Sequence, residues 1–63
     1  MFREADRVVL KKAKPEYGLN RGAVGIIVKA HKGSAGYEVE FMAPVGKPAI
    51  VVLLKTGDIR AAD

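Results

Sequence analysis

The sequence predicts a small all-β domain in which five short strands close into a partly open barrel. No helical repeat of apolar residues continues for ten residues. Short segments rich in Val, Ile, Tyr and Phe recur instead, separated by Gly and Pro. The length of 63 residues leaves room for one domain, expected over residues 1–63, and closing a short sheet hides its edges.

The third predicted strand shows the clearest division into two faces. Tyr37, Val39 and Phe41 fall on one side, which we assign to the core, and Glu38 and Glu40 fall on the other. We interpret the two glutamates, about 7 Å apart, as a solvated outer face. The five predicted strands span 7–12, 23–30, 36–42, 49–54 and 59–61.

The second and fourth strands are apolar on both sides. In the second strand, Ile26 shares a side with other apolar residues, yet Ile27 is apolar as well. Gly25 is a candidate for a bulge that shifts the register there. The fourth strand has Val51 and Leu53 on one side and apolar residues on the other. Only one side can face the barrel core, so we expect the outer, apolar side to be covered by another surface.

The connections carry turn residues. A type I turn is expected at 14–18, with Pro second and Gly at the end, and a turn of 3₁₀ helix at 56–58. Residues 32–36 are typical of a hairpin loop, and 43–48 join the third strand to the fourth.

Composition argues for a soluble cytoplasmic protein without cofactor or metal. The chain lacks Cys, so it has neither disulfides nor thiolate metal sites. Charged residues begin at Arg3, which does not fit a signal peptide, and the longest apolar run is too short to cross a membrane. His31 and Ser34 are single residues of their kind, and no third group is evident to orient them for catalysis. We therefore expect no enzymatic activity.

Three stretches resemble the bacterial domain-of-unknown-function family 4926. They are residues 15–25 (PEYGLxRGxVG), 37–41 and 58–60. The resemblance implies an SH3-like barrel and no activity. More loosely, 22–28 is similar to the KOW motif, which occurs in barrels that contact RNA or protein. The family pattern often has polar residues where this chain has Ile26 and Leu53, which implies additional apolar surface if both face outward.

Our first hypothesis is a non-catalytic module that binds a protein partner, either a subunit encoded nearby in the same operon or another copy of itself. Apolar outward residues and a loop tyrosine suit such an interface. An accessory barrel of a larger enzyme would use the same surface. The predicted interface residues are Tyr17, Ile26, Val51 and Leu53.

The alternative hypothesis is weak, sequence-tolerant nucleic-acid binding of the KOW kind. The net charge of +4 is uneven, with +5 over residues 1–32 and −1 over the remainder. Phosphate contacts would be electrostatic, and only Tyr17 and Phe2 remain for stacking on bases. The residues of this predicted basic set are Lys11, Lys12, Lys14, Arg21, Lys29 and Lys32.

Overall fold

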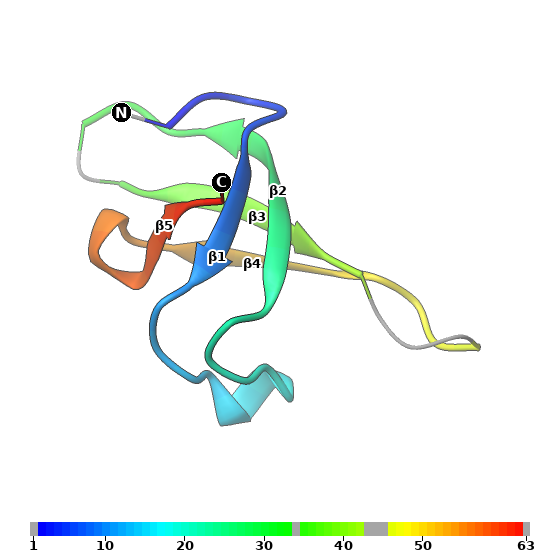
Figure 1. Cartoon of the computed structure of the whole chain (residues 1–63). Helices are drawn as coiled ribbons and strands as arrows, with labels where there is room; N and C mark the ends of the chain where they lie inside the picture. The colour runs from blue at the N-terminus through cyan, green and yellow to red at the C-terminus, as the bar shows by residue number, and fades with distance from the viewer. Residues whose placement is uncertain (1, 34, 43–45, 63) are drawn as a thin grey trace.

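The computed structural model describes residues 2–33, 35–42 and 46–62. Within these residues five strands and two short 3₁₀ helices follow one another (Figure 1). They are β1 (Arg7–Leu10), η1 (Pro15–Tyr17), β2 (Val24–Ala30), β3 (Tyr37–Phe41), β4 (Ile50–Leu54), η2 (Thr56–Asp58) and β5 (Ile59–Ala61).

The strands form one antiparallel sheet in the order β4-β3-β2-β1-β5. β4 and β5 are the two ends of that sheet and are consecutive in the chain, so η2 spans the opening between them (Figure 1). The predicted all-β, five-stranded, partly open barrel is confirmed. The first strand is shorter than predicted, because it ends at Leu10.

The core is formed by side chains from all five strands. Val39 and Phe41 are buried, as predicted, while Tyr37 is only half-buried at the end of β3. The ring of Phe2 packs edge-on against Tyr37, with the ring centroids 5.5 Å apart, so Phe2 is engaged in packing. The buried core residues are Val8, Leu10, Ile27, Val39, Phe41, Val52, Leu54 and Ile59.

Gly25 faces the core at the centre of β2. It pairs in regular register with Val8 on β1 and Phe41 on β3. A Cβ at this position would lie 2.6 Å from Cγ1 of Val39 and 3.0 Å from Cδ1 of Phe41. Glycine is therefore required because its neighbours fill the space, and the prediction of a bulge at Gly25 was wrong.

The irregularity in β2 lies further along the strand. The pairing with β3 shifts between Ile27 and Lys29, which leaves Val28 as the extra residue. The backbone of Ile27 is held on its other side by the segment before β1. Its N–H donates to Asp6 O at 2.9 Å, and its carbonyl accepts from Ala5 N at 2.7 Å. These bonds hold the strand where its register changes.

The expected turns are present with one difference. The type I turn predicted at 14–18 is extended into η1, because Tyr17 N donates to Lys14 O at 2.9 Å and Gly18 N to Pro15 O at 3.0 Å. The 3₁₀ turn predicted at 56–58 is confirmed as η2. Ser34 in the predicted hairpin loop and residues 43–45 of the predicted 43–48 loop lie outside the described residues.

Candidate interaction surfaces

Five large apolar side chains of β2 and β4 are exposed, and besides Val24 and Val28 they include three that pair with the glutamates of β3. Ile26 is 42% exposed, Val51 52% and Leu53 58%. Ile26 and Val51 both pair with Glu40 on β3, and Leu53 pairs with Glu38. The three side chains, called the apolar stripe below, therefore flank a row of two glutamates on one face.

β4 carries most of the apolar stripe and lies at the end of the sheet. In the described part of the chain it pairs with β3 alone. Its residues Ile50–Leu54 include neither a charge nor a proline, the devices by which proteins usually protect edge strands. The outward side of β4 is therefore apolar next to an unpaired backbone edge.

The glutamates of β3 are less solvated than predicted. Both are half-buried, and Oε2 of Glu38 lies 2.7 Å from Nε2 of His31. Lys29 is the β2 residue opposite Glu38. Glu38 thus joins the end of β2 to β3, and His31 is half-buried beside it.

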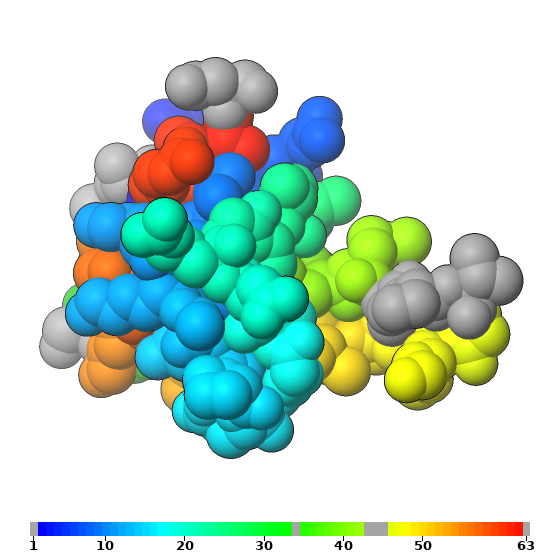
Figure 2. Space-filling model, turned by 60° about the horizontal axis from the view of Figure 1, so that its bottom comes forward, coloured from blue at the N-terminus to red at the C-terminus, as the bar shows by residue number. Residues whose placement is uncertain are grey.

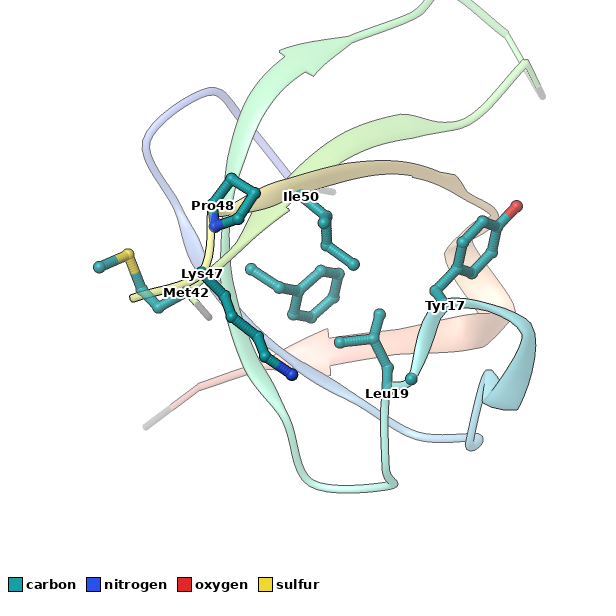
Figure 3. Close-up of a pocket in the computed structure, with 8 residues that line it drawn as sticks. Tyr17, Leu19, Met42, Lys47, Pro48 and Ile50 are labelled. Atoms are coloured by element: carbon teal, nitrogen blue, oxygen red, sulfur yellow. The ribbon is translucent and has the colours of Figure 1, made fainter. Parts of the chain in front are cut away.

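Tyr17 lies apart from the apolar stripe, at the mouth of the barrel. It is 49% exposed and borders a cavity of about 420 Å³ with Leu19 and Ile50. Leu19 and Ile50 point toward one another across this cavity, and Met42 points away from it (Figure 3). The structure therefore places Ile26, Val51 and Leu53 on one face, whereas Tyr17 borders the cavity next to Ile50, on the side of β4 that carries the core residues.

The predicted basic set divides into separate places. Lys14 forms an ion pair with Asp58, with Nζ 3.4 Å from Oδ1. Lys29 and Lys32 lie at the end of β2 and in the loop that follows it. The remaining members, Lys11, Lys12 and Arg21, lie in the first long loop, residues 11–23 between β1 and β2, which Figure 2 shows in blue and cyan.

A residue that sequence reasoning missed joins two of these cations. Arg60 on β5 pairs with Val9 on β1 and borders a second cavity together with Lys11 and Arg21. Arg60 lies almost 40 residues from Arg21 in the sequence, and only the pairing of β1 with β5 brings it near. The only available sequence signal was the short apolar strand expected at 59–61.

Asp58 ties the first long loop to η2. The N–H of Lys55 donates to Oδ2 of Asp58 at 3.0 Å and, with the neighbouring Lys14 ammonium, holds the pKa of this carboxyl below its ordinary value of 3.8, although partial burial opposes the shift. The Asp58 carboxylate therefore has a structural role, because it joins Lys14 of the loop to η2.

The remaining features to consider are metal-binding clusters, the single serine and membrane-spanning helices. In residues 2–33, 35–42 and 46–62, no three His, Asp or Glu side chains gather where they would hold a metal ion. Ser34, considered above with His31, lies outside these residues. In the same part of the chain, no helix has the length and apolar character needed to cross a membrane.

Comparison with known proteins adds the family. Neither the curated proteins nor the solved structures contain a match to the chain. A family model described as "Domain of unknown function (DUF4926)" matches residues 4–61, which is nearly the whole chain and includes all five strands. The family predicted from the three motifs is confirmed: the chain belongs to the domain-of-unknown-function family DUF4926.

Proposed function

We propose that the chain is a non-catalytic, cytoplasmic interaction module that binds a protein partner, another subunit or a second copy of itself, through the apolar stripe. One observation carries the proposal: Ile26, Val51 and Leu53 are about half exposed on one face, where they lie on the two sides of Glu38 and Glu40. Exposed apolar side chains that gather on one face, with polar residues beside them, are typical of interaction sites. Covering each of them would stabilise a complex by about 1 kcal/mol.

The edge of β4 supports the same proposal. Its outer edge has backbone N–H and C=O groups that pair with no other strand of the described residues. A partner strand laid along this edge would gain main-chain hydrogen bonds and would contact Val51 and Leu53 with alternate side chains. Glu38 and Glu40, which lie between Ile26 and the two β4 residues, would fix the orientation of the partner through polar contacts.

Tyr17 supplies a second contact at a distance from the stripe. Tyr17 borders the cavity beside Ile50, the first residue of β4, and its ring points outward (Figure 3). A partner that runs along β4 toward its N-terminal end would reach this cavity. Tyrosine is favoured at such positions because it combines a large apolar surface with a polar tip.

The test compares Leu53→Asp with Lys32→Gln. Both substitutions lower the net charge by one unit at exposed positions, but only the first lies in the stripe. Sedimentation velocity measures self-association, and affinity capture from the native cells followed by mass spectrometry detects another subunit. We expect the wild type and Lys32→Gln to retain the same complex and Leu53→Asp to lose it.

Circular dichroism and thermal unfolding of both variants control for folding. We expect Leu53→Asp to unfold at nearly the wild-type temperature, because its side chain is outside the core. A folded Leu53→Asp that retains every complex of the wild type would contradict the proposal.

A further inference from the structure

A second surface, on the opposite half of the outer face, gathers three cations. They border a shallow cavity of about 390 Å³ over the end of β1. Its lining has a positive charge from three side chains and no carboxylate. The lining residues of this basic cavity are Val9, Leu10, Lys11, Arg21, Gly22 and Arg60.

Backbone hydrogen bonds fix the segments that carry these cations. Gly22 N donates to Leu10 O at 2.9 Å, and Leu10 N donates to Ala23 O at 2.8 Å, which joins the end of the first long loop to β1. Lys11 N donates to Asp58 O at 2.7 Å, which attaches the residue after β1 to η2. The cations are therefore carried by backbone that is already ordered.

No acid lines the cavity, and no carboxylate of the described residues forms a salt bridge with its three cations. Asp58, two residues before Arg60, is engaged by Lys14 and by the N–H of Lys55. Glu38 and Glu40 lie on β3, which is separated from β1 by β2. Among the described residues, neither Lys11, Arg21 nor Arg60 takes part in a salt bridge.

We propose that the basic cavity binds phosphate groups of a nucleic-acid backbone. Two guanidinium groups and one ammonium group around a single cavity suit phosphate oxygens, which arginine binds with paired N–H donors. The lining includes no aromatic ring, so bases have no platform for stacking there. Binding is therefore electrostatic and independent of base sequence. This proposal does not depend on the proposed protein interface.

The test uses fluorescence anisotropy with a short labelled single-stranded DNA at several salt concentrations. Three phosphate contacts predict a slope of log K against log salt of about −2 for a single strand. The double variant Arg21→Gln/Arg60→Gln leaves one phosphate contact, so the slope should become shallower, at about −0.7. The control Lys29→Gln/Lys32→Gln loses the same charge at the other end of β2 and should retain the wild-type slope and affinity.

Lys11→Gln is a second variant that removes one phosphate contact. It should make the slope shallower by about 0.7. Thermal unfolding verifies that each variant is folded. Polyglutamate is the competitor that distinguishes phosphate from carboxylate, and it should displace DNA poorly at equal charge. The proposal is overturned if the wild type does not bind DNA at low salt, if the two double variants lose affinity equally, or if polyglutamate competes as well as unlabelled DNA.

Discussion

The two halves of the outer face differ in chemistry although one sheet carries both. Over β2 and β4 the outward side chains include Ile26, Val51 and Leu53, with glutamates between them. Over the end of β1 and β5 the cavity is bordered by Lys11, Arg21 and Arg60. The buried side chains beneath both halves are aliphatic or aromatic. Strand alternation thus leaves the outward positions free to differ while the core stays common.

Gly25 is where the halves depend on each other, because it pairs with β1 on one side and β3 on the other. Gly25→Ala should cause the largest loss, about 2–3 kcal/mol in the free energy of unfolding, because the added Cβ meets Val39 and Phe41. Gly57→Ala is the matched control, since a Cβ there meets no atom within 4 Å. Urea denaturation measures both, and equal losses would refute the close packing at Gly25.

Gly22→Ala should affect the basic half more than the apolar half. Gly22 has φ of +95° and open space around it, so the cost comes from the backbone alone. We expect a loss of about 1–2 kcal/mol in the free energy of unfolding and weaker DNA binding, because Arg21 is displaced. Denaturation and anisotropy measure the two effects. A variant as stable as the wild type would show that the left-handed conformation is not needed.

Asp58 connects the first long loop to η2 and so supports the basic half. Its pKa is lower in the folded chain than the ordinary 3.8, mainly through the Lys55 N–H and then Lys14. The stabilisation is therefore present above pH 3.8 and is lost as the pH falls through the lower folded value. Asp58→Asn should cost about 1 kcal/mol at neutral pH, and less below this range. Denaturation across pH tests this, and a pH-independent difference would contradict it.

Ile26→Thr should have the smallest effect on stability. Ile26 is 42% exposed, so we expect a change within about 0.5 kcal/mol in the free energy of unfolding. Binding of the protein partner should nevertheless weaken, because a polar hydroxyl replaces apolar contact area. Denaturation and sedimentation measure the two properties. A loss of several kcal/mol would place Ile26 in the core and remove it from the stripe.

The fold was predictable because alternation and turn residues act locally. The alternation from Tyr37 to Phe41 predicted which side of β3 is buried, and the residues at 56–58 predicted η2. The bulge at Val28 was not predictable, since the residues from Val24 to Val28 are apolar or glycine and fit either register. The register is set by the pairing of β2 with β3 and by the backbone hydrogen bonds of Ile27 to residues 5 and 6.

The candidate surfaces were predictable only in part. The polar residues expected by family resemblance at positions 26 and 53 directed attention to Ile26 and Leu53, and both are exposed. The basic set was drawn from neighbours in sequence, so it included Lys14, which Asp58 engages, and omitted Arg60. The set of charges that share a surface depends on which strands pair, and these strands lie far apart in the chain. No local sequence pattern predicts this pairing.

The most direct test of the division into two surfaces is an NMR titration of the isotope-labelled chain with single-stranded DNA, following backbone amide shifts. The two-surface account predicts shifts at Lys11, Arg21, Gly22 and Arg60, with the amides of β4 unchanged. Shifts centred on Val51 and Leu53, or on Lys29 and Lys32, would contradict it.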